Sequence, residues 1–436
     1  MSSLPEAARP TLPAAAPPTA TTTVVVGMGY VGLPTSLSLL VAGFDVVGVD
    51  VSGRRLQEIQ DGTADLVARD ARRLRLALGS RSFKLTRSPA AIATADAVII
   101  CVPTPVDEQR RPDLTALRAA CASVVRHARP GQTIILTSTT YAGTTRDLLV
   151  APLAARGLVA GVDIHVAFAP ERIDPGSLGH DADTTPRVIG GATPACAEAA
   201  ARVIGEIAPS LAIVSSCEAA ELTKLYENTF RAVNIALANE LAGMARHLGL
   251  DTMEVTRAAA TKPYGYMPFF PGAGVGGHCI PCDPHYLIHP LRGTGVPTAL
   301  VQTAMDAIAG RPAQVVGRAV AELADHGRSI EGARVIVVGA AYKPGVRDVR
   351  ESPAVDIIRL LRAHGAEVSY HDDLIPTVDA GEDLGLIAVG EPDGAAYDLA
   401  ILAVRHPGAD LDWLDDCPIV VDCTYNTHAG RRRVVV

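Results

Sequence analysis

The 436-residue sequence lacks an apolar run long enough to span a bilayer, and it lacks any block of basic residues. A membrane-spanning helix needs roughly 18 consecutive apolar residues, so we expect no membrane segment. The 39 Lys and Arg residues are outnumbered by 47 Asp and Glu, which gives a net charge of −8. Because a general nucleic-acid binder needs an electropositive face, we also expect no nucleic-acid partner.

Signals for export and for a disulfide framework are missing too. The first residues show neither a basic start with an apolar segment nor the Arg-rich pattern of a transit peptide. The 8 cysteines are scattered along a long chain, whereas disulfide frameworks belong to short, cysteine-dense proteins. We therefore expect a cytoplasmic protein with reduced thiols. With 48% apolar residues, the chain can form several ordinary cores.

The chain divides by composition and periodicity. Residues 1–21 are mostly Pro, Ala, Ser and Thr, and we expect a disordered extension there. From Val24 onward, short apolar runs alternate with helical patterns, which is typical of βαβ units around a parallel sheet. The expected strands are Val24–Val26, Asp45–Asp50, Asp96–Val102, Thr133–Thr139, Ile164–Ala169 and Leu211–Ser216.

The pattern changes at Glu218. Glu218–Leu248 contains no Pro and one Gly, and Gly249 follows as a helix-ending residue, so we expect one long helix. A second α/β unit begins at Ala333. Its expected strands are Arg334–Gly339, Glu367–His371, Leu399–Val404 and Ile419–Asp422, with a helix that begins at Ser352-Pro353 and is closed by Gly365. The fold class is therefore α/β, with two Rossmann-like doubly wound domains joined by a long helix.

A glycine-rich loop predicts a dinucleotide site. Gly27-Met28-Gly29-Tyr30-Val31-Gly32 lies between the first strand and a helical pattern, which is the context that this motif requires. Asp50 closes the second strand, where an acid accepts hydrogen bonds from a ribose 2′-hydroxyl and repels a 2′-phosphate. The pattern favours NAD over NADP. The alternative is that the glycines serve packing alone.

A second glycine-rich loop, Pro271–His285, carries two cysteines and two histidines. We expect Asp283 as N-cap and Pro284 as the first residue of a helix, so that Cys279 lies just before the helix N-terminus, where the pKa of a thiol falls. Three interpretations compete: a Cys279/Cys282 redox pair, a zinc site of His278, Cys279, Cys282 and His285, and a nucleophilic Cys279 beside an incidental Cys282. We favour the nucleophile, because no second paired set of ligands closes a zinc site. No metal is expected.

Lys224 and Asn228 lie one turn apart on the long helix, and Arg231 continues the same stripe. The simple interpretation is a solvated polar face. However, few fully exposed sides are left on this helix by its apolar residues Leu222, Leu225, Ile235 and Leu237. A buried Lys beside an Asn needs polar partners, which a substrate hydroxyl would supply.

Together, seven ordered motifs resemble the UDP-glucose/GDP-mannose dehydrogenase family of NAD-dependent nucleotide-sugar 6-dehydrogenases. They are Gly27–Pro34, Cys101–Pro105, Ser138–Thr145, Pro170–Arg172, Glu221–Asn228, Gly276–Cys279 with Asp283, and Ala341–Pro344 with Arg350–Ser352. The segments Asn228–Glu240, Pro170–Gly176 and Gly276–Leu287 are most similar to the branch that acts on UDP-N-acetylglucosamine or its epimers.

The resemblance implies oxidation of the sugar C6 alcohol to a carboxylate, with two NAD molecules used in turn. Cys279 would carry a thiohemiacetal and then a thioester, while Lys224 and Asn228 would stabilise the oxyanion. Asp283 would activate water, and Glu171 and Thr139 would act in hydrolysis. The implied cofactor set is Gly27, Met28, Gly29, Tyr30, Val31, Gly32, Asp50, Arg55, Thr104, Thr139 and Arg350. The implied substrate set is Glu171, Arg172, Lys224, Asn228, Gly276 and Lys343.

The resemblance also implies the domain organisation. We expect an NAD-binding domain over residues 22–210, a central helical dimerisation domain with the cysteine loop over 211–325, and a UDP-sugar-binding Rossmann-like domain over 326–436. The expected partners are a UDP-sugar substrate and a second copy of the chain, held through the Glu218–Leu248 helix.

The sequence departs from the family at two places. Ala142 stands where the family often has Pro, and Asp422–Asn426 lacks the usual Arg, which leaves the anchoring of the nucleotide there open. Several alternatives also stay open. The same chemistry could act on UDP-N-acetylmannosamine, UDP-N-acetylgalactosamine or UDP-glucose. From another class, the chain could be a non-catalytic nucleotide-sugar binder or a zinc protein.

Overall fold

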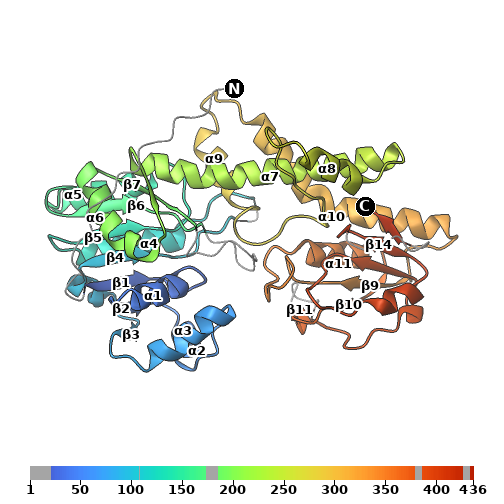
Figure 1. The fold of residues 1–436 in the computed structure, drawn as a ribbon, viewed down its shortest axis with the longest axis horizontal. Coiled ribbons are helices and arrows are strands. Elements are labelled where there is room, and N and C mark those ends of the chain that lie inside the picture. The colour runs from blue at the N-terminus through green and yellow to red at the C-terminus, as the bar shows by residue number, and fades with distance from the viewer. Residues whose placement is uncertain (1–20, 108, 173–184, 379–384, 426–432) are drawn as a thin grey trace.

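The computed structural model describes residues 21–107, 109–172, 185–378, 385–425 and 433–436. The extension expected over residues 1–21 lies outside these ranges, apart from residue 21. Within them, no helix combines the length and the apolar character that crossing a bilayer requires. Figure 1 shows two α/β domains at opposite ends of the molecule, with helices spanning the distance between them.

The N-terminal domain is built on an eight-stranded sheet with the order β3-β2-β1-β4-β5-β6-β7-β8. All neighbouring pairs are parallel except β6 and β7. Val24 and Val26 pack in one core cluster while Val25 packs in the other, because successive side chains of a strand point to opposite faces. The strands are β1 (Thr22–Val26), β2 (Asp45–Val49), β3 (Phe83–Thr86), β4 (Ala97–Ile100), β5 (Thr133–Leu136), β6 (His165–Phe168), β7 (Arg187–Gly191) and β8 (Leu211–Val214).

Six of these strands were predicted, and β3 and β7 were missed. The helices of this domain are α1 (Gly32–Val41), α2 (Gly53–Gln60), α3 (Ala68–Leu78), α4 (Thr115–His127), α5 (Ala151–Ala155) and α6 (Pro194–Ile204). With helices between its strands and the order 3-2-1-4-5-6 across its first six strands, the sheet is doubly wound as predicted.

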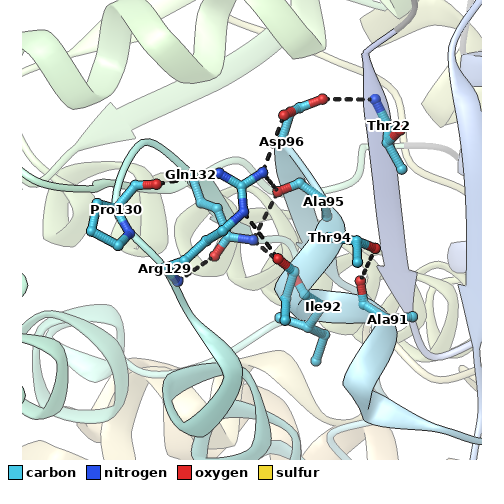
Figure 2. A network of polar contacts seen from close by, with 10 residues as sticks. Thr22, Ala91, Ile92, Thr94, Ala95, Asp96, Arg129, Pro130 and Gln132 are labelled. Atoms are coloured by element: carbon cyan, nitrogen blue, oxygen red, sulfur yellow. Dashed lines mark hydrogen bonds and ion pairs between the residues drawn. The ribbon is translucent and has the colours of Figure 1, made fainter.

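A polar network fixes the amino ends of three central strands (Figure 2). The Gln132 amide donates to the carbonyls of Ile92 and Ala95 at 2.6 and 2.8 Å, and Arg129 also donates to the Ala95 carbonyl at 2.8 Å. Asp96 accepts from the Thr22 amide at 3.0 Å. These contacts tie the starts of β1, β4 and β5 together. They lie at the edge opposite the carboxyl ends, so the network is structural and leaves the ligand-binding edge of the sheet free.

Two long helices connect the domains. Helix α7 (Cys217–His247) is N-capped by Ser216, whose side chain accepts from the Ala219 amide, and the chain leaves the helix through Gly249 in the left-handed region at φ 69°. This confirms the predicted long helix. Helix α10 (Ala299–Asp325) packs against both α7 and α11 (Pro353–Ala363). Figure 1 shows α7 running from the N-terminal domain to the space above the C-terminal domain, where α8 (Thr252–Ala260) contacts it.

The C-terminal domain has a parallel five-stranded sheet with the order β10-β9-β13-β14-β15. Helix α11 (Pro353–Ala363) begins after Ser352 and is followed by Gly365 at φ 83°, as predicted. The strands are β9 (Arg334–Val338), β10 (Glu367–His371), β13 (Leu399–Leu402), β14 (Val420–Asp422) and β15 (Arg433–Val435), and β11 (Thr377–Val378) pairs with β12 (Leu386–Ile387) in a separate ribbon. Four of these strands were predicted.

Candidate active site

The glycine loop after β1 has the shape that a dinucleotide needs. Gly27 has φ 92°, and a Cβ there would meet the Cys101 carbonyl oxygen at 2.6 Å. A Cβ at Gly32 would overlap the Gly27 carbonyl oxygen at 1.8 Å, so the helix start packs tightly on the loop. At Gly29 no heavy atom lies within 4 Å of a Cβ position. The backbone at the second glycine is therefore open to a pyrophosphate, and the loop fits the cofactor.

Asp50 and Arg55 hold this loop from the neighbouring strand and helix. The Asp50 carboxylate follows β2 and accepts from the amides of Met28 at 2.7 Å and Ser52 at 2.8 Å. The Arg55 Nε donates to the Met28 carbonyl at 2.8 Å. Asp50 thus lies beside the glycine loop, where the motif requires an acid, and it remains half-buried.

Tyr30, in the same loop, reaches the C-terminal domain. The Arg350 guanidinium lies 4.2 Å from the centre of the Tyr30 ring and pairs with Asp348 at 2.6 Å. The Arg350 carbonyl accepts from the Gly277 amide at 3.0 Å. The predicted cofactor residues Tyr30 and Arg350, which are distant in sequence, are therefore brought together. They meet beside the cysteine loop.

The cysteine loop packs on the C-terminal domain through its glycines. A Cβ at Gly276 would meet the Glu351 carbonyl oxygen at 2.5 Å, and Gly277 has φ 79° with the Tyr342 ring against it. Cys279 is exposed at the end of this run, and its carbonyl accepts from the Asp283 amide at 2.8 Å. The loop is therefore closely packed on the C-terminal domain at Gly276 and Gly277, and Cys279 follows as an exposed residue.

The expectation that Asp283 caps the following helix is wrong. Helix α9 (Asp283–Ile288) begins at Asp283, and Cys282 occupies the N-cap position without a side-chain capping bond. The backbone is already helical at Cys282, with φ −104° and ψ −49°, so the cap moves one residue toward the N-terminus. This leaves the Asp283 carboxylate available to another partner.

That partner is the long helix. Lys224, Asn228 and Asp283 are buried, with 9%, 8% and 2% exposure, and the Asn228 amide donates to the Asp283 carboxylate. The interpretation of this stripe as a solvated face is therefore wrong for Lys224 and Asn228, whereas Arg231, which continues the stripe, is exposed. Burial raises the pKa of Asp283 to about 6, and the Lys224 charge and the Asn228 hydrogen bond oppose that rise. The raised pKa makes the Asp283 carboxylate a stronger base than an exposed aspartate.

The two cysteines have different surroundings. Cys282 is buried, and burial raises the pKa of its thiol to about 12. Cys279 is exposed. Within the described part of the chain, no group of three or more His, Cys, Asp or Glu side chains is placed to hold a metal ion.

Glu171 and Arg172 are engaged by residues that sequence reasoning did not single out. The Glu171 carboxylate is buried and pairs with Arg187 of β7 at 2.6 Å. Arg172 pairs at 2.5 Å with Glu227, the residue before Asn228 on α7. Thr139 is partly exposed just after β5. Thr104 is buried beside Pro105, whose carbonyl accepts from the Tyr286 hydroxyl of α9 at 3.0 Å, and this bond ties the loop to the cysteine segment.

A separate cavity of about 430 Å³ lies between the central and C-terminal domains. Three cationic residues line it, Lys343, Arg405 and Arg257, together with the Pro271–Gly274 part of the cysteine loop. Lys343 follows β9 and Arg405 follows β13, at the carboxyl edge where doubly wound sheets bind ligands. Lys343 was predicted, while Arg257 and Arg405 were missed. The strand predicted over Leu399–Val404 would have indicated Arg405.

Three family models cover this chain in order. The NAD binding domain of the UDP-glucose/GDP-mannose dehydrogenase family matches residues 21–207, the central domain matches 218–307 and the UDP binding domain matches 336–426. The N-terminal glycine loop therefore belongs to an NAD site.

Relatives with assigned activities align over most of the chain. The UDP-N-acetyl-D-glucosamine 6-dehydrogenase of Pseudomonas aeruginosa is 36% identical over 88% of this chain and 90% of its own length. The UDP-N-acetyl-D-mannosamine dehydrogenase of Pyrococcus horikoshii is 34% identical over 85% of this chain and 89% of its own.

The fold agrees with these relatives. A solved structure of the UDP-D-ManNAc dehydrogenase from Pyrococcus horikoshii superposes with a TM-score of 0.86 at 30% identity, covering 95% of this chain and 98% of that one. A UDP-glucose dehydrogenase from Pyrobaculum islandicum gives a TM-score of 0.83 at 28% identity, covering 95% and 96%. With its three domains matched and its length covered, the chain belongs to the UDP-glucose/GDP-mannose dehydrogenase family, whose members are NAD-dependent nucleotide-sugar dehydrogenases.

Proposed function

We propose that the chain oxidises the C6 hydroxyl of a UDP-sugar to a carboxylate in two NAD-dependent steps. The observation that carries the proposal is the buried Lys224–Asn228–Asp283 set, joined to the exposed Cys279 through one turn of backbone. A simple alcohol dehydrogenase has no need of a thiol at this place. A two-step oxidation does, because the aldehyde must be held covalently for its second oxidation.

Each residue then has one role. NAD bound at the glycine loop of Gly27–Gly32 would supply the hydride acceptor for each of the two oxidations, and the hydroxyl proton lost in each would pass to solvent. The Cys279 thiolate adds to the C6 aldehyde, and the C–S bond forms as the carbonyl becomes an oxyanion, toward which Lys224 and Asn228 donate. After the second oxidation a thioester remains on Cys279. Asp283 takes a proton from the attacking water, with Glu171 and Thr139 assisting, and hydrolysis releases the acid and returns the thiol.

The cavity at the carboxyl edge of the second sheet is suited to the nucleotide. Lys343, Arg405 and Arg257 supply the positive charge that a diphosphate needs on a chain with net charge −8. Its wall includes Pro271–Gly274, and Gly274 lies two residues before Gly276 and five before Cys279. A UDP-sugar anchored there by its nucleotide would extend along the loop toward the thiol.

For the sugar we propose UDP-N-acetylglucosamine, supported by the relative from Pseudomonas aeruginosa and by the loop resemblance. The second candidate is UDP-N-acetylmannosamine, favoured by the relative and the superposed structure from Pyrococcus horikoshii. The test is NADH release against a panel of UDP-N-acetylglucosamine, its manno and galacto epimers, UDP-glucose and GDP-mannose. We expect two NADH per acid formed. One NADH with a stable aldehyde product would overturn the two-step proposal.

We also propose a homodimer held through α7. Large apolar side chains are exposed along this helix at spacings of four and seven residues, which places them in one stripe: Leu222, Tyr226, Phe230, Leu237 and Met244. A second copy of the chain would cover this stripe. The domain limits proposed with it are residues 22–210, 211–325 and 326–436.

A further inference from the structure

The second sheet repeats, at β10, the acid that follows β2 in the first. Asp372 comes directly after β10, as Asp50 comes after β2, and its carboxylate likewise turns back to the loop after the neighbouring strand. One oxygen of Asp372 accepts from the amides of Ala340 at 2.6 Å and Ala341 at 3.1 Å. The other accepts from the amides of Leu374 and Ile375 at 2.8 and 2.9 Å.

Unlike Asp50, Asp372 is also hydrogen-bonded to a buried histidine. The His406 Nε2 lies 3.1 Å from the Asp372 carboxylate, whose side chain is fully buried. The other ring nitrogen, Nδ1, accepts from the Gly345 amide at 3.0 Å. Because an amide N–H can only donate, Nδ1 carries no proton and Nε2–H donates to Asp372. Both ring nitrogens of this buried histidine are therefore used within the protein.

These contacts join the two loops that carry the cations of the cavity. Lys343 lies between Ala341, held by Asp372, and Gly345, held by His406. Arg405 is the residue before His406 and also lines the cavity. At the base of the loops, a Cβ on Gly339 would meet the Val404 carbonyl oxygen at 2.2 Å, so the loops are in close contact there. His406 adds a second connection nearer the cavity.

We propose that His406 is a positioning residue for the nucleotide: bridging Gly345 and Asp372, it sets the spacing between Lys343 and Arg405 that binds the substrate diphosphate. This inference rests on the proposed function, since it takes the cavity as the nucleotide site. A phosphate group is bound well only when its donors are already in place, because ordering two long side chains and their loops costs affinity.

The decisive comparison uses three variants in the full-length protein. His406→Leu removes both hydrogen bonds, whereas His406→Gln keeps one acceptor and one donor at a similar separation. His371→Leu is the matched control. His371 is a buried histidine of the same domain, hydrogen-bonded to the Val389 carbonyl at 2.7 Å, and it does not line the cavity. The measurements are calorimetric binding of UDP, steady-state kinetics with the UDP-sugar and NAD, and thermal melting.

For His406→Leu we expect about tenfold weaker UDP binding and a similar rise in KM for the UDP-sugar, with kcat and KM for NAD within about twofold. His406→Gln should recover most of the affinity. His371→Leu should lower the melting temperature without changing UDP binding. Unchanged UDP binding in His406→Leu, or equal weakening in His371→Leu, would overturn the positioning role.

The same experiment separates this inference from the proposed function. If the wild-type protein binds UDP and reduces NAD but His406→Leu behaves like it, the positioning role fails and the proposed function stands. If the wild-type protein binds UDP but none of the UDP-sugars supports NAD reduction, the proposed function fails. The comparison of UDP binding among the variants still decides the role of His406. A wild-type protein that binds no UDP would overturn both.

Discussion

Separate serine substitutions of Cys279 and Cys282 test the covalent mechanism, because the two thiols lie three residues apart in opposite environments. Cys282 is buried and the pKa of its thiol is about 12, so at pH 7 only about one molecule in 100,000 carries a thiolate there. Cys279 is exposed and can be reached by a substrate. Because the thiolate is the nucleophile, the buried and neutral Cys282 thiol is unsuited to the covalent role, and we assign that role to Cys279.

Cys279→Ser should therefore lower the rate of acid formation by at least about 1,000-fold, because a serine alkoxide is far harder to form and its ester hydrolyses slowly. Cys282→Ser should keep the rate within about twofold and cost about 1 kcal/mol of stability, since the side chain is small and the Val106 amide that contacts the thiol can donate to a hydroxyl instead.

The assay follows NADH by absorbance and resolves aldehyde from acid by chromatography, with thermal melting of each variant as the check on folding. Accumulation of the aldehyde with Cys279→Ser alone would agree with the covalent role. Equal loss of acid formation in both variants, with both folded, would refute it and favour a role that the two thiols share, such as a redox pair.

Four further outcomes follow from the contacts described. Asp50→Ala should raise the ratio of NADP to NAD turnover, measured as kcat/KM for each cofactor, and equal use of both by the native enzyme would contradict the ribose role of Asp50. Because burial raises the pKa of Asp283 to about 6, the rate should fall as the pH drops below about 6 and the carboxylate gains a proton; a flat profile down to pH 5 would argue against it as the base. Tyr226 is 67% exposed on α7, and Tyr226→Glu should give monomers in light scattering, whereas the control Leu76→Glu on α3 should leave the dimer intact. A native protein that is itself monomeric would refute the proposed dimer. Burial raises the pKa of Asp372, but its hydrogen bonds outweigh burial and lower the pKa to about 2, below the value in the unfolded chain. The stabilisation by this carboxylate is therefore present above about pH 4 and lost toward pH 2. Asp372→Asn should lower the free energy of unfolding, measured by urea titration, by about 2 kcal/mol at pH 7 and by much less at pH 2.

Much of the fold could be predicted from apolar runs. The missed elements contain residues that interrupt the expected strand or helix pattern. Strand β3 carries Lys84, and β7 carries Arg187 and two glycines, so neither reads as a buried strand. No helix was predicted for Ala299–Asp325, where Pro312 breaks the helical pattern. Its Arg311 is fixed by a hydrogen bond to the Gly272 carbonyl at 2.9 Å, a contact between distant segments that periodicity cannot show.

The candidate site divides in the same way. Lys224 and Asn228 could be placed on one face of a helix because their spacing alone decides it. Their contact with Asp283 required the α9 segment to dock on α7, and it depended on the cap falling at Cys282 instead of Asp283. Arg187 and Glu227, which hold Glu171 and Arg172, belong to elements far from their partners in sequence. Local patterns carry no information about such pairs.

The two acids that follow β2 and β10 show why motif reading alone would misassign the second domain. Both Asp50 and Asp372 accept hydrogen bonds from the loop that follows the neighbouring strand. The Asp50 carboxylate accepts from the amides of Met28 and Ser52 and is half-buried at the edge of the glycine loop, so a ribose hydroxyl can still reach it. Asp372 accepts from four amides and from His406, and its side chain is fully buried. No lone pair or open surface is left there for a ligand. In the second domain the acid at this position is therefore an internal support, and we expect the ligand of this domain at the loops that the support holds.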